Sequence, residues 1–374
     1  MRNMLDSNLC ARFQPSFTNK ECDHYIYAED DQMNLKHGEC GYCNLRDAYR
    51  CVADVTRIVP LSHSSVGTFL TCHYLYYLQK ILGIEVRPPF LSNALKAGKL
   101  WDCVKQKHLG EDINLKSIID EYEIDPYIVA KVRSLYHAYK ELEITVDEGY
   151  ELQAEIRLSY DIILTPSSFI PSVNINSEKI NLWADRMEQA GDERKWIFPM
   201  RITGFYDRKY PTYFCEDKLS GRPEFYLDPH YINSQIGTYF LADPNLESVI
   251  IEVCQMPQQK VLDEGKKRQA KETPEELYAR VYQDILSRPS TYFIGWDKTK
   301  KRYGKKFYRG EFSLDDVVAR YKQIVLEILS ARYNNGFYKN EKVCNNIYPG
   351  VSCDMMPICR NGNMSDTQFK IRDK

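Results

Sequence analysis

Three side chains that can hold a metal ion and use it lie in one short segment: Asp207, Glu216 and Lys218. Carboxylate oxygens are the ligands that Mg²⁺ prefers, and a lysine beside them can orient or deprotonate a water molecule and offset phosphate charge. The backbone carbonyl of Asp217 offers a further oxygen ligand. These residues therefore predict a site for metal-assisted hydrolysis. The alternative interpretation is a surface hairpin with an ordinary ion pair.

The residues around these three predict the elements that position them. Segment 197–203 is mostly apolar and β-branched, and segment 212–218 is a second apolar run that ends in charge, so both predict strands. Residues 208–211, which include a proline, predict the turn that joins them. Because side chains alternate along a strand, such a hairpin is expected to bring the two carboxylates together, with the lysine on the face of the glutamate.

A helix is predicted after the hairpin, over residues 228–242, and Gln235 and Tyr239 stand one turn apart on one face of it. In chain order the segment reads Gly-Phe-Tyr-Asp at 204–207, Glu-Asp-Lys at 216–218 and Gln-x-x-x-Tyr at 235–239. This order resembles the PD-(D/E)XK nuclease superfamily. Within it, the chain is most similar to the RecB/AddB-type branch, which includes the iron–sulfur nucleases of recombination and CRISPR adaptation.

The resemblance implies an α/β fold: a restriction-endonuclease-like core with a mixed central sheet flanked by helices. It also implies a Mg²⁺- or Mn²⁺-dependent deoxyribonuclease, and more narrowly an exonuclease of DNA recombination, repair or replication, in a phage-like member. Its catalytic residues would be Asp207, Glu216, Lys218, Gln235 and Tyr239. The alternative is a catalytically inert scaffold of the same fold that binds nucleic acid. The sequence has no Gly-x-x-x-x-Gly-Lys-Ser/Thr loop, so any helicase partner would be a separate protein.

A third acidic residue enters through the same resemblance. The family has a glycine followed four residues later by a metal-binding histidine, and here Gly98 is followed by Asp102. A carboxylate suits Mg²⁺ at that place, so the resemblance makes Asp102 a further metal ligand beside Asp207 and Glu216. The alternative is a solvated helix residue.

Cysteines predict a second kind of metal centre. The chain has 12 of them and no secretion signal, which favours thiolate ligation over disulfides. Cys344, Cys353 and Cys359 lie in a tail rich in Gly, Pro and Asn, and Cys72 lies in a helix predicted over 62–82. Four thiolates are the number that a [4Fe–4S] cluster takes. One cysteine before the core and three after it resembles the iron–sulfur members of the family, while zinc is the chemical alternative.

The N-terminal segment contains a second set of thiols in a polar, poorly periodic sequence. A closed tetrahedral zinc site is predicted from its four best-spaced cysteines: Cys22, Cys40, Cys43 and Cys51. His24 or His37 could replace the first of these, and Cys10 is a further candidate. Unligated cysteines in a loop are the alternative.

A basic stretch over residues 298–309 predicts contact with DNA, either single-stranded or at duplex ends. It interleaves cations for phosphates with rings for bases, the combination that single-strand binding uses. The candidate contacts are Lys300, Lys301, Arg302, Tyr303, Lys305 and Lys306. The alternative is a solvated hairpin tip.

Composition bounds these interpretations. The chain has 374 residues, 43% hydrophobic and 27% charged, with a net charge of −2, so DNA binding must rest on local patches. No apolar run is long enough to span a membrane and no signal peptide is recognisable, which predicts a cytoplasmic protein with no membrane partner. The expected domains are a Cys-rich segment over 1–55, a nuclease core over 56–335 and a cluster-closing tail over 336–374.

Overall fold

The structure is a computed structural model. It describes residues 60–164, 186–190, 193–264, 270–333, 336–344, 353–361, 365 and 367–371. The predicted N-terminal zinc site falls outside the described residues with all four of its cysteines: Cys22, Cys40, Cys43 and Cys51.

The chain forms two compact units, each assembled from separate stretches of sequence. Unit 1 takes residues 1–86, 157–204 and 318–374, and unit 2 takes residues 87–156 and 205–317. The segment expected to form a single core is thus divided between the two units. Together they make a mixed α/β protein, and a mixed sheet with helices on both of its faces lies in unit 2.

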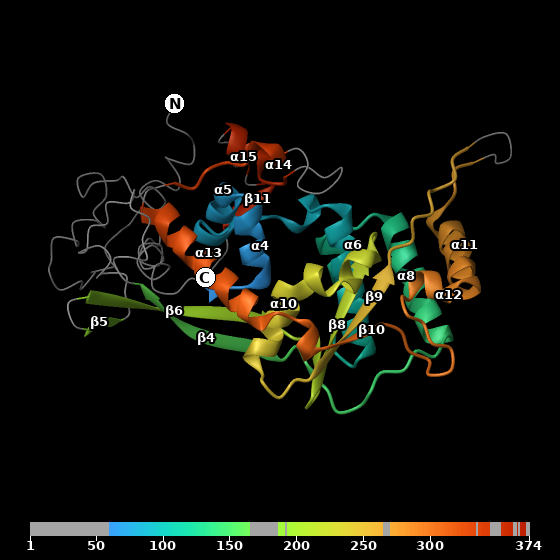
Figure 1. The fold of residues 1–374 in the computed structure, drawn as a ribbon. Coiled ribbons are helices and arrows are strands. Elements are labelled where there is room, and N and C mark those ends of the chain that lie inside the picture. The colour runs from blue at the N-terminus through green and yellow to red at the C-terminus, as the bar shows by residue number, and fades with distance from the viewer. Residues whose placement is uncertain are drawn as a thin grey trace. The chain divides into compact units, whose positions relative to one another are not determined.

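The sheet of unit 2 has five strands in the order β10-β9-β8-β7-β3. Strands β8, β9 and β10 are labelled in Figure 1. Its central pair, β8 (Tyr213–Ser220) and β9 (Ser248–Gln255), is parallel over the full length of both strands. The outer pairings are antiparallel: β10 (Lys305–Tyr308) with β9, β7 (Arg208–Lys209) with β8, and β3 (Glu151–Leu152) with β7.

Alternating side chains of the central strands enter two different cores. On one face Phe214, Val249 and Ile251 pack with Ile236 and Phe240 of α10. On the other face Cys254 packs into a cluster with residues of three helices: α6 (Asn93–His108), α8 (Pro126–Glu141) and α11 (Pro274–Ser287). The central strands are therefore covered on both sides, as a parallel pair requires.

Local sequence signals set the helix starts as predicted. The helix expected over 228–242 is α10 (Pro229–Ala242), and its cap residue Asp228 accepts a hydrogen bond from the His230 N–H at 2.9 Å. The sequence Thr-Pro-Glu-Glu at 273–276 predicts a second helix start, and at α11 Thr273 and Glu276 form a reciprocal capping box with proline in the first helical position. The remaining elements of unit 2 are η3 (Pro88–Phe90), α7 (Leu115–Glu121), η5 (Pro223–Leu227), α12 (Pro289–Tyr292) and η6 (Arg309–Glu311).

The sequence also predicts a helix over 115–142 and a strand over 151–163, but each is divided because the backbone turns at one residue. Residues 115–142 form α7 and α8 rather than one helix, and the chain between them turns at Glu123, where φ is +45°. Residues 151–163 form β3 and then β4 (Glu155–Leu164), separated at Gln153, where φ is +52°.

The predicted hairpin is also corrected. The strand expected over 197–203 is β6 (Glu193–Phe205), but it pairs with β1 (Pro60–Leu61), β4 and β5 (Arg186–Ala190). The partner of β8 in the hairpin is instead the two-residue strand β7, in which Arg208 is paired with Cys215.

Unit 1 contains the sheet β1-β6-β4, to which β5 is added, and the small antiparallel pair β2 (Ile84–Val86) with β11 (Phe369–Ile371). The helix predicted over 62–82 begins after the cap residue Ser62 as expected, but it is divided at Cys72. Its parts are α4 (His63–Thr71), α5 (His73–Tyr76) and η2 (Tyr77–Ile81). The other helices are α14 (Glu341–Cys344), α15 (Met356–Asn361) and α13 (Leu314–Tyr333), which begins in unit 2. Within the described part of the chain, no helix combines the length and apolar character needed to cross a membrane.

Gly295 provides a test of the packing in unit 2. It has φ of +78°, and a Cβ atom there would lie 2.6 Å from the backbone oxygen of Gly304. We expect Gly295→Ala to lower the free energy of unfolding by about 1–3 kcal/mol, because both the backbone conformation and the close approach exclude a side chain. Urea denaturation measures the loss. Gly310→Ala is the matched control, since a Cβ there meets nothing within 4 Å, and an equal loss in both variants would contradict the assigned packing.

Candidate functional site

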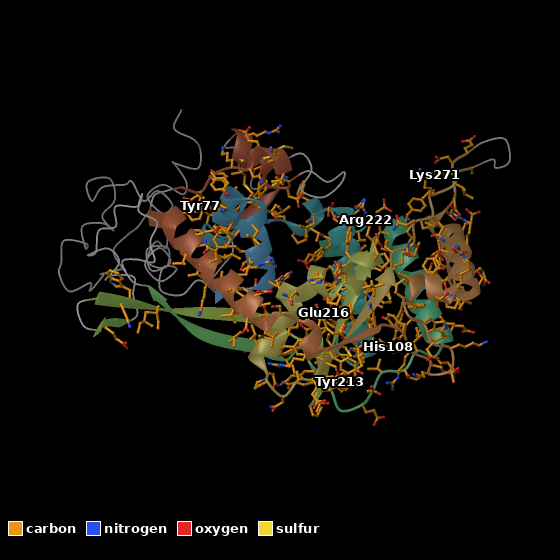
Figure 2. All side chains as sticks on the ribbon, viewed as in Figure 1. Tyr77, His108, Tyr213, Glu216, Arg222 and Lys271 are labelled. Carbon is orange, nitrogen blue, oxygen red and sulfur yellow. The ribbon has the colours of Figure 1, made fainter. Side chains whose placement is uncertain are left out.

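Glu216 and Lys218 lie on the face of β8 that α10 covers. Glu216, labelled in Figure 2, is only 3% exposed. Its Oε1 accepts hydrogen bonds from the Lys218 ammonium and from Gln235 Nε2, the latter at 2.6 Å. Gln235 Nε2 also lies 3.1 Å from the hydroxyl of Tyr239, one helical turn further on. The structure therefore brings these four predicted residues together.

Asp207 is added from the neighbouring strand segment. It directly precedes Arg208, whose pairing with Cys215 places Asp207 opposite Glu216 when the antiparallel register is continued. Asp207 Oδ2 accepts a hydrogen bond from the backbone N–H of Asp217 at 2.8 Å. The carboxylate of Asp207 is thus held against the strand that carries Glu216 and Lys218, and we call these three residues the trio.

The trio is short of positive charge. Burial and the neighbouring Glu216 raise the pKa of Asp207 well above its usual range, and burial raises the pKa of Glu216 despite the opposing effect of Lys218. Glu216 Oε2 is buried and has no hydrogen-bond partner among the described residues. An additional cation would satisfy the unpaired oxygen and offset the mutual repulsion of the two carboxylates.

Lys218 is held in its charged form. Burial lowers its pKa, but Glu216 and Asp207 outweigh that effect and the net shift is upward. A lysine with a raised pKa cannot serve as a general base near neutral pH. Of the two roles that the sequence allows for this amine, the structure favours orienting a water molecule and offsetting negative charge.

The carboxylates of Asp207 and Glu216 fit Mg²⁺ or Mn²⁺ as a two-carboxylate site. Within the part of the chain that the structure describes, no group of three or more His, Cys, Asp or Glu side chains is arranged to hold a metal ion. Asp207 and Glu216 are a pair, and Mg²⁺ is commonly bound through one or two carboxylates while it keeps several water molecules. Together with the unpaired Glu216 oxygen, the two carboxylates fit such an ion.

Asp102, the third expected ligand, stands at the edge of this arrangement. Its side chain is 40% exposed on α6 and is joined to its own helix, with Lys99 Nζ at 3.8 Å and Gln106 Nε2 at 3.1 Å. Burial is the largest cause that raises its pKa, and the charges of Asp217 and Lys218 also act on it. Its carboxylate is therefore near the trio, while its hydrogen bonds run along the helix.

Sequence reasoning missed the role of the side chain of Asp217. Because it lies between Glu216 and Lys218 on a strand, it must point to the opposite face, where α6 packs. There it lies 3.5 Å from Lys105 Nζ and 3.4 Å from Arg208 Nη2. Burial raises the pKa of Asp217, but Arg208 and Lys105 outweigh it and lower the pKa to about 2. The sequence does contain the relevant pattern, because side-chain alternation along a strand places residue 217 on the face opposite residues 216 and 218.

In unit 1 the structure brings together the backbone segments that carry the four predicted cluster cysteines. Cys72 has an extended backbone between α4 and α5, and its Sγ accepts a hydrogen bond from the backbone N–H of Asn340 at 3.4 Å. Cys344 closes α14, and its backbone oxygen accepts a hydrogen bond from the N–H of Cys353 at 2.8 Å. Lys339 Nζ donates to the backbone oxygen of Cys359 at 2.5 Å.

The thiols of these cysteines are also close enough to affect one another. Burial raises the pKa of Cys353 to about 11, and Cys344 and Cys72 add to the rise. Burial likewise raises the pKa of Cys359, on which the same two cysteines act. All four are free thiols. Four thiolates are the number that a [4Fe–4S] cluster or a zinc ion takes, but among the described residues these four thiols are not arranged as a group that holds a metal ion.

The basic stretch is less available than its sequence indicates. Lys301 and Arg302 are paired with Glu143 and Asp147, and Lys300 lies 3.7 Å from Asp297. The prediction that the ring of Tyr303 stacks on a base is wrong, because this side chain is 4% exposed and belongs to the core around α6 and α8.

Two of the candidate cations have no carboxylate partner among the described residues, and one aromatic ring of this stretch is exposed. Lys305 and Lys306 are exposed, and Lys306 Nζ lies 5.1 Å from the ring centre of the exposed Tyr308. Lys305 Nζ donates to the backbone oxygen of Leu227 at 3.1 Å, in the segment that follows β8.

Comparison of this chain with protein-family models, with curated proteins and with solved structures gave no match.

The charge deficit of the trio predicts how stability depends on pH. An Asp whose pKa is raised in the folded state destabilises the fold as pH rises from about 4, where unfolded Asp titrates, through the raised value. In EDTA, Asp207→Asn should therefore unfold at higher urea than the wild type, by a margin that is larger near pH 8 than near pH 4.

Asp243→Asn is the matched control, because the opposite sign is expected. Burial opposes ionisation of Asp243, but bonds from Lys209 and the Asn245 N–H outweigh it and lower its pKa. Its loss should therefore destabilise the protein at neutral pH. If Asp207→Asn is instead less stable than the wild type at every pH, the trio carries no uncompensated negative charge.

Proposed function

We propose that the protein is a metal-dependent deoxyribonuclease that hydrolyses phosphodiester bonds. The observation that carries the proposal is the convergence of Asp207, Glu216 and Lys218 at one point of unit 2, with a Glu216 oxygen that has no hydrogen-bond partner among the described residues. Two neighbouring carboxylates and an ammonium supply the ligands for a divalent cation and a fixed positive charge beside it. DNA as the substrate, and exonucleolytic action in recombination, repair or replication, rest on the family resemblance.

Asp207 and Glu216 would hold Mg²⁺ or Mn²⁺, with the backbone carbonyl of Asp217 as a further oxygen ligand. When bound, such an ion polarises the scissile phosphate and lowers the pKa of an attacking water. Lys218 orients that water and stabilises the negative charge that develops on the phosphate oxygens. Gln235 holds Glu216 in position through their 2.6 Å hydrogen bond, and the Tyr239 hydroxyl in turn holds the amide of Gln235.

DNA contact would come from the surface next to this site. Lys305 and Lys306 offer charge for phosphates, and the exposed ring of Tyr308 offers a face on which a base can stack. The anchoring of Lys305 to Leu227 places this surface beside the segment that leaves β8. The DNA phosphates would thus be contacted by Lys305 and Lys306, which have no carboxylate partner in the described structure.

The four cysteines of unit 1 would hold a [4Fe–4S] cluster with a structural role. Cys72 comes from the break between α4 and α5, and the other three ligands come from the C-terminal tail. Ligation by Cys72, Cys344, Cys353 and Cys359 would fasten that tail to the helices of the same unit. The iron–sulfur assignment follows the family resemblance, and zinc is the alternative that metal analysis distinguishes.

Lys218→Ala tests the enzymatic function. We expect cleavage of end-labelled DNA with Mg²⁺ to fall by about 10²–10³-fold, because one preorganised charge beside the reacting phosphate is lost. Lys209→Ala is the control. Lys209 lies on β7, forms an ion pair with Asp243 at 2.8 Å and is not a member of the trio. A time course with 5′- and 3′-labelled single- and double-stranded oligonucleotides measures both the rate and the polarity of cleavage.

If the wild type and Lys218→Ala give the same products at the same rate, the cleavage comes from elsewhere and the proposed function is wrong. If the wild type binds DNA without cleaving it under any of these conditions, the inert scaffold is the correct interpretation.

Cys353→Ser tests the iron–sulfur centre. Protein purified without oxygen is expected to be brown, with about four iron atoms per chain, because iron–thiolate charge transfer colours such clusters. Loss of one ligand should reduce the iron content by at least half, while Cys103→Ala, which alters a buried cysteine of α6, should leave it unchanged. Colourless anaerobic protein with one tightly bound zinc in place of iron would contradict the assignment.

A further inference from the structure

A buried ionic group lies on the face of β8 that is opposite the trio. It consists of Lys105 on α6, Arg208 on β7, Asp217 on β8 and Glu252 on β9, so that one helix and three adjacent strands of unit 2 each contribute a charge. None of the four side chains belongs to the proposed catalytic set, to which Asp217 contributes only its backbone carbonyl.

The four side chains form a closed set of ion pairs. Lys105 Nζ lies 3.5 Å from Asp217 Oδ1 and 3.3 Å from Glu252 Oε2. Arg208 Nη2 lies 3.4 Å from Asp217 Oδ2 and 2.7 Å from Glu252 Oε2. Each cation thus contacts both anions, and the formal charges of the group sum to zero.

The group is removed from solvent to an unusual degree. The side chains of Lys105 and Arg208 are 2% and 1% exposed, and those of Asp217 and Glu252 are 9% and 11% exposed. Burying four charges is costly, and apolar residues of similar volume often stabilise a core as well or better. Stability alone is therefore a weak reason for such a group, whereas a requirement for one fixed geometry is a better one.

The ionic group is connected by covalent neighbours to every member of the trio. Arg208 follows Asp207 directly, and Asp217 stands between Glu216 and Lys218. The backbone N–H of Asp217 is also the donor that holds Asp207 Oδ2, at 2.8 Å. Fixing the side chains of Arg208 and Asp217 on one face of the sheet therefore fixes both backbone segments whose catalytic side chains point to the other face.

We propose that Lys105, Arg208, Asp217 and Glu252 are positioning residues, which hold the carboxylates of Asp207 and Glu216 at the separation that a divalent cation requires. This inference rests on the proposed function, because it concerns the metal site of the trio. Asp217 has two roles in it. Its carboxylate anchors the strand in the ionic group, and its N–H aims the side chain of Asp207.

Asp217→Asn removes one charge of the group and keeps both the side-chain shape and the backbone N–H. The expected effect is an increase of about 10-fold or more in the Mg²⁺ or Mn²⁺ concentration for half-maximal cleavage, with kcat at saturating metal much less affected. Glu252→Gln is the second variant, on a strand that carries no member of the trio, and it should shift the metal requirement in the same direction.

Glu272→Gln is the matched control for stability. Glu272 is 2% exposed in the same unit and accepts bonds from Arg280 through both oxygens, at 2.8 and 2.7 Å, so its loss also breaks an ion pair of a buried carboxylate. It has no contact with the trio, and its metal requirement should stay within about twofold of the wild type even where its unfolding midpoint falls.

Metal binding is measured independently of cleavage, as the rise in unfolding temperature that Mn²⁺ alone produces. This rise should be largest in the wild type and in Glu272→Gln, and reduced in both variants of the ionic group. If those two variants keep the wild-type metal requirement and the wild-type Mn²⁺ shift while losing stability like Glu272→Gln, the ionic group is only structural and the inference is overturned.

The outcome also separates this inference from the proposed function. If Mn²⁺ stabilises the wild type but the wild type cleaves no DNA, the proposed nuclease function is wrong. A smaller Mn²⁺-induced rise in the unfolding temperature of Asp217→Asn would still support the positioning role. A wild type that neither cleaves DNA nor responds to Mn²⁺ would overturn both.

Discussion

Strand β8 carries charges on both of its faces, and the organisation of unit 2 depends on how each face neutralises them. On one face Glu216 and Lys218 meet Asp207 beneath α10, and on the other Asp217 meets two cations beneath α6. The charges of the second face balance one another, whereas on the first face one oxygen of Glu216 has no hydrogen-bond partner in the described part of the chain. This difference is the physical basis for placing a metal site on the α10 face.

The same contrast explains the directions in which the carboxyl groups titrate. Asp217 and Glu216 are both largely buried, with side chains 9% and 4% exposed. The pKa of Asp217 is nevertheless lowered because Arg208 and Lys105 lie beside it, while that of Glu216 is raised because burial outweighs Lys218. A buried acid with a raised pKa destabilises the fold when it is ionised, and such strain is commonly found where function requires it. Ionisation is therefore unfavourable at Glu216 and favourable at the adjacent residue Asp217.

Much of this arrangement follows from local sequence. Strand alternation places Glu216 and Lys218 on one face, helix periodicity aligns Gln235 with Tyr239, and the caps at Asp228 and Thr273 begin their helices where expected. What failed depended on partners distant in sequence. The strand before Asp207 pairs in another sheet, and no local pattern reveals which strand a β-branched run will join.

The errors at Tyr303 and Cys72 have similar causes. A tyrosine among lysines looks exposed until α6 and α8 are known to cover it, and the neighbouring cations find acids from a distant segment. At Cys72 the helix divides although its sequence is apolar and periodic, because contacts from the tail at Tyr338 and Asn340 replace the helical pattern there. Tertiary partners decided both cases.

Anomalous scattering of Mn²⁺, in a crystal of the wild-type protein grown with that ion, tests the proposed metal site most directly. We expect a single strong peak in unit 2 between the carboxylates of Asp207 and Glu216, on the α10 face of β8. Mn²⁺ bound elsewhere while these two carboxylates stay free, or no bound ion at a concentration that supports cleavage, would contradict it.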